Sequence, residues 1–218
     1  TNIGKSIFLG NIASNIAEEG KNVLLVTLEM SELLYARRIC SNVTKIPMKE
    51  LAQNSASIKH GMSNEDGKIF IKEFPPATIT ANQLKAFIKK FEEQGIKLDA
   101  IVLDYLNLMH STVGNNSYER IKHVTEQVRA MSYLFNCPII SATQLNRAGF
   151  DTDNPHLATI SESIGLAATA DAIISIFQNE EDRGIGVIRL GMMKNRYGPR
   201  GNTQAMRIDY STLTIEQA

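Results

Sequence analysis

Short apolar runs alternate with segments of helical periodicity along this chain, and this alternation limits the possible folds more than any other sequence feature. The apolar runs have the length of buried strands, and the segments between them carry the apolar stripes of helices. This order predicts an α/β fold in which a mainly parallel sheet carries helices on both faces. The predicted strands cover 21–28, 68–74, 100–104 and 138–142, and the predicted helices cover 5–19, 31–43, 80–94 and 117–135.

The chain changes character toward its end. A further buried strand is predicted over 172–177, and two more follow over 186–191 and 204–209. We therefore expect a strand-rich, antiparallel hairpin region after Gly186. No repeat or low-complexity segment interrupts the 218 residues, so we expect them to form a single domain.

Charge and composition exclude some classes of protein. Lys plus Arg and Asp plus Glu each number 23, which gives a net charge of zero. A protein that coats nucleic acid is basic overall, so the zero net charge argues against that class. A protein that holds one nucleic-acid strand in a small channel is compatible with zero net charge. No apolar run reaches the roughly 18 residues of a membrane span. Cys40 and Cys137 lack metal-ligand spacing, which favours free thiols in a reducing compartment, so we expect a cytoplasmic location.

The first residues match the second half of a phosphate-binding loop, GxxxxGKS. They read Thr1-Asn2-Ile3-Gly4-Lys5-Ser6. In that motif, backbone amides at a helix N-terminus cradle phosphates, the lysine reaches the terminal phosphates and the serine binds magnesium. The fragment alone is equally compatible with a Gly-Lys-Ser that begins a helix. Since a strand normally precedes this loop, we expect an upstream strand and an N-terminal domain outside these residues.

Two acidic residues stand at the ends of predicted strands. Asp104 ends the apolar run at 101–103, a Walker B pattern that would place its carboxylate beside magnesium held by Ser6. A strand that happens to end in Asp is the alternative. Glu29 follows the strand at 21–28, on the edge where parallel strands gather their C-terminal ends. It fits either a general base for water or an acid that favours the dipole of the next helix.

Polar residues also follow two later strands. Gln144 comes after the strand at 138–142, where an amide fits a γ-phosphate sensor or a local loop contact. Lys194 and Arg196 lie in the run MKNRYG, which follows one of the last predicted strands. They fit a pair of cations that reaches a neighbouring subunit's nucleotide, or an exposed hairpin in solvent.

Together these segments resemble one family, the hexameric replicative DNA helicases of the DnaB type, and most of all the helicases of T-even-like phages. The segments TQLNR and E-S-x-G-L-x-A-T-A-D are much more specific than the Walker motifs. The resemblance implies a RecA-like P-loop NTPase fold and a motor domain that hydrolyses ATP to translocate on single-stranded DNA and unwind duplex at the replication fork. It rests on TNIGKS, VTLEMSE, IVLDYLNLM, SATQLNRAG, ISESIGLAATAD and MMKNRYGPRG, in the family's order over nearly the whole chain.

The resemblance implies ATP and Mg²⁺ as cofactors. Ser6 and Asp104 would hold the metal, and Glu29 would be the catalytic base. Bacterial relatives carry Arg-Glu-Ser where this chain has Ser161-Glu162-Ser163, so any role of that arginine does not transfer. The residues implied to form the ATP-binding loop are Asn2, Ile3, Gly4, Lys5 and Ser6. The other residues implied to act in catalysis are Lys5, Gln144 as γ-phosphate sensor, and Lys194 and Arg196 as the trans-acting lysine and arginine finger.

The resemblance also implies partners. Single-stranded and forked DNA would pass through a homo-hexameric ring, and a primase and a helicase loader would bind the protein. The loops at 110–116 and 147–157 would face DNA, and because both are poor in basic residues, backbone amides and small polar groups would grip the phosphates. Asn146 and Arg147 are the candidate contacts, although Arg147 equally suits a structural ion pair.

Two other functions remain compatible with the sequence. A RecA- or RadA-like recombinase shares the fold and the ATP site, but it forms filaments on DNA instead of closed rings. A non-hydrolysing nucleotide-binding module that scaffolds replication proteins is the other alternative. Glu29 and the cations Lys194 and Arg196 argue against that module, because it needs neither a catalytic base nor a finger.

Overall fold

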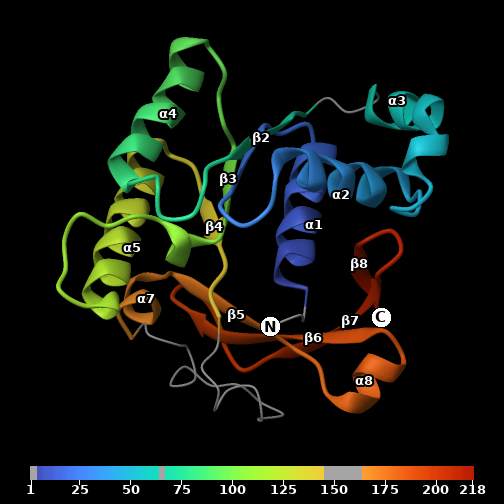
Figure 1. Ribbon diagram of the computed structural model, residues 1–218. Helices are drawn as coiled ribbons and strands as arrows, with labels where there is room; N and C mark the ends of the chain where they lie inside the picture. The colour runs from blue at the N-terminus through green and yellow to red at the C-terminus, as the bar shows by residue number, and fades with distance from the viewer. Residues whose placement is uncertain (1–3, 64–66, 145–163) are drawn as a thin grey trace.

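The computed structural model describes residues 4–63, 67–144 and 164–218, which form two four-stranded sheets (Figure 1). One sheet is parallel, with the order β2-β1-β3-β4, and the other is antiparallel, with the order β5-β6-β7-β8. The parallel strands are β1 (Val23–Thr27), β2 (Ile69–Glu73), β3 (Ala100–Asp104) and β4 (Ile139–Ser141). The antiparallel strands are β5 (Ala172–Phe177), β6 (Val187–Asn195), β7 (Thr203–Asp209) and β8 (Thr214–Gln217).

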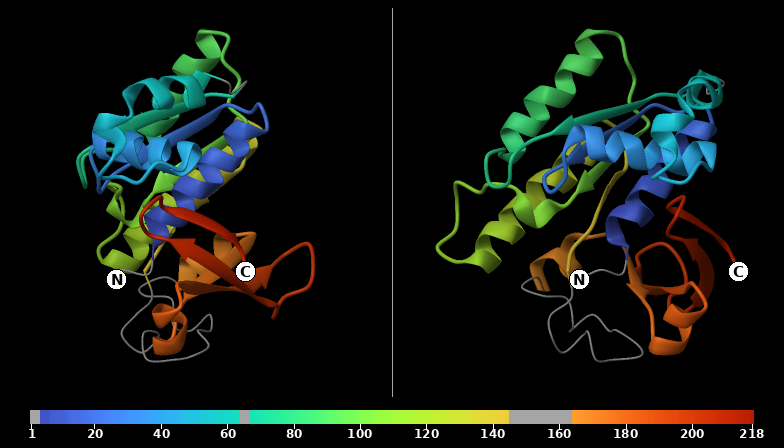
Figure 2. Two further views of the ribbon diagram at one scale, coloured as in Figure 1. Left: turned by 90° about the vertical axis from the view of Figure 1, so that its right-hand side faces the viewer. Right: turned by 45° about the vertical axis from the view of Figure 1, so that its right-hand side comes forward.

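Helices cover both faces of the parallel sheet, as the alternating sequence pattern predicts (Figures 1 and 2). Residues of β1 point alternately to the two faces. Leu24 and Val26 pack into one apolar cluster with α4 and α5, whereas Val23 and Leu25 pack into another with α1 and α2. The four helices are α1 (Lys5–Glu18), α2 (Glu32–Thr44), α4 (Ala81–Glu93) and α5 (Ser117–Leu134).

Side-chain caps fix where three of these helices begin. The Ser31 hydroxyl accepts a hydrogen bond from the Leu34 amide, and Thr80 forms a reciprocal capping box with Gln83. The Asn116 side chain accepts a hydrogen bond from the Glu119 amide at the start of α5. The described ranges also contain shorter helical segments and a strand, β8, that were not predicted. These helical segments are η1 (Leu51–Gln53), α3 (Ser55–Ser63), η2 (Leu106–Leu108), α7 (Ile164–Thr169) and α8 (Glu180–Gly184).

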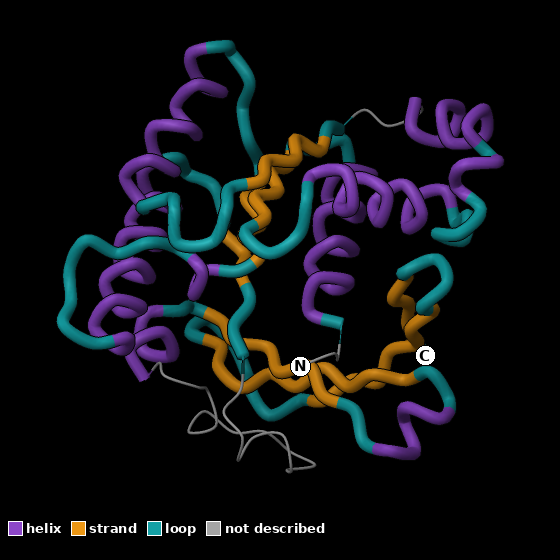
Figure 3. The backbone as a smooth tube through the Cα atoms, in the orientation of Figure 1, coloured by secondary structure: helices purple, strands orange, loops and turns teal. Residues whose placement is uncertain are grey.

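Helix α1 also contacts the second sheet, most of which lies below α1 in Figure 3. The buried Asn11 side chain donates a hydrogen bond to the Leu213 carbonyl over 2.8 Å and accepts one from the Ile215 amide over 2.9 Å. Asn42 of α2 donates to the same carbonyl over 3.0 Å and to Asn11 over 2.9 Å. These hydrogen bonds connect the start of β8 to α1.

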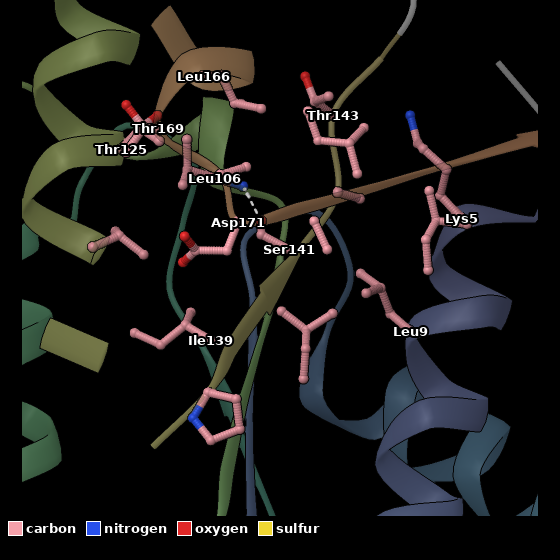
Figure 4. A pocket seen from close by; sticks show the side chains of 18 of the residues that line it. Lys5, Leu9, Leu106, Thr125, Ile139, Ser141, Thr143, Leu166, Thr169 and Asp171 are labelled. Atoms are coloured by element: carbon pink, nitrogen blue, oxygen red, sulfur yellow. Dashed lines mark hydrogen bonds between the residues drawn. The ribbon is translucent and has the colours of Figure 1, made fainter. Parts of the chain in front are cut away.

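A cavity of about 580 Å³ separates the two sheets. Within the described ranges, β4 pairs only with β3 and β5 pairs only with β6, so each sheet presents an unpaired edge to this cavity. Apolar side chains such as Leu9 of α1 and Ile139 of β4 line it, and Lys5 and Thr143 lie along its rim (Figure 4). The helices that the structure describes include none with the length and apolar character needed to cross a bilayer.

Candidate nucleotide-binding site

Helix α1 begins with an open N-terminus. Gly4 precedes it with a φ of 97°, a left-handed conformation that glycine adopts without strain. Glycine at this position offers no side chain to cap the helix, and no side chain of the described residues caps the first-turn amides. Such amides, together with the helix dipole, favour an anionic group. Asn2 and Ile3, which we predicted to shape this loop, lie outside the described residues.

The two predicted acidic residues, Glu29 and Asp104, lie at the C-terminal ends of neighbouring strands. Strands β1 and β3 are parallel neighbours with Thr27 opposite Asp104, and the Leu28 amide donates a hydrogen bond to the Asp104 carbonyl over 2.7 Å. Thr27 Oγ accepts a hydrogen bond from the Met30 amide over 3.0 Å, which shapes the turn that carries Glu29. Glu29 itself is exposed. The structure therefore brings Glu29 and Asp104 to the same edge.

Lys5 completes a cluster of opposite charges at this edge. Burial lowers the pKa of the Lys5 ammonium, and the negative charges of Glu29 and Asp104 act in the opposite direction. The Lys5 Nζ atom also lies 5.2 Å from the centroid of the Tyr105 ring. One cation thus lies near both acids, on the first residue of a helix that has no side-chain cap among the described residues.

Asp104 is fully buried at the end of β3. Burial raises its pKa, and the Ser6 hydroxyl and Tyr35 act against that rise. Its Oδ2 atom accepts a hydrogen bond from Tyr35 Oη over 3.1 Å. Its Oδ1 atom is buried, and the described residues provide no hydrogen-bond partner for it. A buried carboxylate oxygen without a donor, beside a serine hydroxyl, fits a hard cation such as Mg²⁺.

Gln144 ends the described part of the β4 segment. It lines the same cavity as Lys5, so the structure brings these two predicted residues to one space. Ser141 holds β4 against the end of β3, because its hydroxyl donates to the Leu103 carbonyl over 2.7 Å and accepts from the Leu106 amide over 3.0 Å (dashed line in Figure 4).

The predicted DNA-facing loops are only partly described. Asn146, Arg147 and the loop at 147–157 lie outside the described residues. In the loop at 110–116, the Val113 amide donates to Ser111 Oγ over 3.3 Å and the Asn115 amide donates to Glu119 over 2.8 Å. These two amides already have partners within the chain, so they are less suited to gripping phosphates than we expected.

Lys194 and Arg196 both bind groups of the same chain. Lys194 Nζ donates hydrogen bonds to the Ala167 and Ala168 carbonyls, over 2.7 and 3.0 Å, near the end of α7. Arg196 is exposed, and its Nη1 atom lies 2.6 Å from Asp171 Oδ1. Arg129 of α5 binds the same oxygen over 2.9 Å. Sequence reasoning found no acid adjacent to Arg196, and the fold supplies one from before β5.

Sequence reasoning also missed Tyr35. This residue occupies an apolar position of α2, and its ring packs in the cluster that contains Leu9 and Leu25. Only its hydroxyl group, on a helix face directed at the strand ends, distinguishes it from an ordinary core residue. That signal becomes visible once the place of α2 against β3 is known.

Comparisons with known proteins agree on one family. A model described as "DnaB-like helicase C terminal domain" matches residues 1–213. A DnaB-like replicative helicase of Enterobacteria phage T4 is 25% identical over 212 residues, which are 91% of this chain and 45% of that protein. A probable replicative DNA helicase of Trieres chinensis is 29% identical over 224 residues, 93% of this chain and 48% of that protein. The chain thus spans about half the length of these curated relatives.

Solved structures share the fold. One, described as an ATPase domain, has a TM-score of 0.86 at 19% identity, and the match covers 100% of this chain and 81% of that one. Another, of a DnaB-like replicative helicase and its interactions with primase, has a TM-score of 0.86 at 18% identity, and the match covers 100% of this chain and 56% of that one. The predicted RecA-like α/β fold is confirmed.

Proposed function

The chain belongs to the DnaB-like helicase C-terminal domain family, and from this membership we propose that it is the ATP-hydrolysing motor domain of a replicative DNA helicase. The observation that carries the proposal is the gathering of Lys5, Glu29 and Asp104 at the C-terminal edge of a parallel sheet. In open α/β sheets, ligands bind outside the carboxyl ends of the strands. The open amides of α1 begin at this edge and suit phosphates.

Each residue of this edge has a chemical task in the proposal. Lys5 and the first-turn amides of α1 hold the terminal phosphates, while Ser6 and Asp104 hold Mg²⁺. The metal, when bound, supplies positive charge at the phosphate oxygens. Glu29 is exposed, so it has access to water and accepts the proton of the attacking molecule. Gln144, on the cavity shared with Lys5, senses the γ-phosphate.

Lys194 and Arg196 act on the nucleotide of a neighbouring subunit in the proposed hexameric ring. Asp171 is one negative charge shared by two guanidinium groups, Arg129 and Arg196. The cluster therefore retains excess positive charge, and Arg196 is exposed at its outer side. A cation placed in this way stabilises the charge that develops during phosphoryl transfer.

The cavity between the sheets supports a further part of the proposal. Among the described residues, the facing edges of β4 and β5 are unpaired, and the cavity lining is largely apolar. Unpaired strand edges next to an apolar cavity are suited to an additional strand. We assign this place to a strand of the same protein that leads into the phosphate-binding loop, since Lys5 at the start of α1 lines the cavity.

The proposed partners are single-stranded and forked DNA, further copies of the chain in a ring, a primase and a helicase loader. The primase is included because one structure of the same fold is described with its primase interactions. The loops at 110–116 and 147–157 are proposed to face the DNA, with Asn146 and Arg147 as the candidate contacts.

An ATPase assay with and without single-stranded DNA tests the proposed function. The intact protein should hydrolyse ATP in the presence of Mg²⁺, and DNA should accelerate hydrolysis. Lys5→Ala should abolish it, whereas Lys21→Ala, an exposed lysine after α1, should not. Nucleotide binding without hydrolysis would indicate a scaffold module, and filaments on DNA would indicate a recombinase.

A further inference from the structure

A tyrosine hydroxyl connects the two segments that carry the proposed metal ligands. Tyr35 of α2 has 0% of its surface exposed. Its Oη atom lies 3.1 Å from Asp104 Oδ2, at the end of β3, and 3.2 Å from the Ser6 carbonyl, in the first turn of α1. A single buried group therefore contacts both residues to which we assign Mg²⁺.

The surroundings of Tyr35 explain why its ring reaches this place. Gly10 of α1 faces α2, and a Cβ atom there would lie 3.8 Å from Tyr35 Cε1 and 3.6 Å from Ile39 Cδ1. Both distances are ordinary van der Waals contacts, so the Tyr35 ring packs directly against α1 at Gly10. Apolar residues such as Leu9 and Val102 complete the cluster. A phenol in such a cluster needs a polar partner for its hydroxyl group.

The hydroxyl has one proton for two acceptors. The Ser6 carbonyl is a neutral group that also serves the α1 backbone, whereas Asp104 is a carboxylate, and a charged acceptor forms the stronger hydrogen bond. A phenol carries one O–H donor, and the Tyr35 Oη atom lies within hydrogen-bond distance of the carboxylate. The proton is therefore directed mainly at Asp104 Oδ2.

We propose that Tyr35 is a positioning residue that occupies Asp104 Oδ2 and so leaves Oδ1, which lacks any partner among the described residues, for the metal. This inference rests on the proposed function, since it concerns the same nucleotide site. Tyr35 touches neither nucleotide nor water in this scheme. It acts through Asp104, by preventing the carboxylate from rotating and by keeping it close to Ser6.

Tyr35→Phe tests the proposal, because it removes one oxygen atom and keeps the ring. The measurement is the affinity of the intact protein for a fluorescent ADP analogue at increasing Mg²⁺ concentration. The half-saturating Mg²⁺ concentration should rise on the order of ten-fold, the effect of losing one hydrogen bond to a charged group. Nucleotide affinity without metal should change little. The variant should stay folded, with a lower melting temperature because Asp104 Oδ2 loses its buried donor. Tyr210→Phe, a half-exposed tyrosine between β7 and β8, is the matched control and should behave as wild type.

A double-mutant cycle shows whether the effect passes through Asp104. In an Asp104→Asn background, Tyr35→Phe should cause no further change in Mg²⁺ dependence. An unchanged Mg²⁺ dependence in Tyr35→Phe, an equal effect in both backgrounds, or loss of the fold in Tyr35→Phe would each overturn the proposal. If wild type itself shows no Mg²⁺-dependent nucleotide binding, the proposed function is wrong and this inference is wrong with it.

Discussion

Two carboxylates at the same sheet edge have opposite surroundings. Asp104 is fully buried, burial raises its pKa, and one of its oxygens has no partner among the described residues. Glu29 is exposed at the end of β1. A buried acid with a free oxygen suits a metal ion, whereas an acid with access to solvent suits proton transfer from water. The proposed division of roles follows from this difference in burial.

Glu29→Gln should retain nucleotide binding and lose hydrolysis, because an amide cannot accept the proton of the attacking water. We expect the rate of phosphate release to fall by about 10²–10⁴-fold. Glu32→Gln is the matched control. Glu32 is an acid nearby on α2 whose carboxylate pairs with Lys72 over 2.8 Å, so this variant should hydrolyse ATP normally. Normal turnover by Glu29→Gln would make Glu29 only an acid near a helix end.

Residue patterns predicted part of this site for physical reasons. Lys5, Glu29 and Asp104 each adjoin the end of a predicted strand or the start of a predicted helix, and topology then brings such ends together. Tyr35 was missed because its ring packs in the apolar core, as an ordinary apolar side chain would. Asp171 was missed as the partner of Arg196 because only the fold brings them together.

At the scale of elements, one buried amide joins the proposed catalytic helix to the second sheet. Asn11 of α1 bonds the Leu213 carbonyl and the Ile215 amide, while Asn42 of α2 bonds both Asn11 and Leu213. The sheet that carries Lys194 and Arg196 is thereby attached to the helix that carries Lys5.

Asn11→Ala should destabilise the protein, because it removes the acceptor of the Ile215 amide and one partner each of Asn42 and the Leu213 carbonyl, which then keep only their bond to each other. The free energy of unfolding, measured by chemical denaturation, should fall by about 2–3 kcal/mol. Asn15→Ala, at an exposed position of the same helix, controls for helix propensity and should change it by less than about 0.5 kcal/mol. Equal effects of the two substitutions would show that the Asn11 bonds contribute nothing specific.

The long elements were predicted within a few residues, and the short ones were not. Helix α5 carries a stripe of buried residues that includes Ile121, Val128 and Met131, and such a stripe is visible in sequence. Strand β8 is short and partly exposed, and α8 is a single acidic turn capped by Asn179. Their formation depends on tertiary contacts, such as the pairing of β8 with β7, that no local pattern encodes.

At the scale of the whole molecule, the proposed machinery is divided between two sheets. The parallel sheet gathers Lys5, Glu29 and Asp104, and the antiparallel sheet carries Lys194 and Arg196, whose partners are Asp171 and carbonyls of α7. Arg196 is exposed although it pairs with Asp171, and we propose that it serves the nucleotide of a second subunit. Such a division would make hydrolysis depend on assembly.

Mixing two inactive variants tests whether the site is shared between subunits. Lys5→Ala lacks a working pocket, and Arg196→Ala lacks a finger that contributes on the order of 10³–10⁵ in rate. In mixed rings, some interfaces pair an intact pocket with an intact Arg196, so part of the ATPase activity should return. Lys5→Ala mixed with Glu29→Gln is the control and should stay inactive, because no subunit then has both Lys5 and Glu29. If subunits exchange and no activity returns in the first mixture, a shared site is contradicted.

The central claim, that this chain converts ATP hydrolysis into strand separation, is tested most directly with a forked DNA duplex. The measurement is release of one labelled strand by the intact protein, with ATP or with a non-hydrolysable analogue, beside the Glu29→Gln variant. Wild type with ATP should separate the strands, whereas the analogue and the variant should leave the duplex paired. ATP hydrolysis by wild type without strand separation, or strand release at the same rate by Glu29→Gln, would contradict the claim.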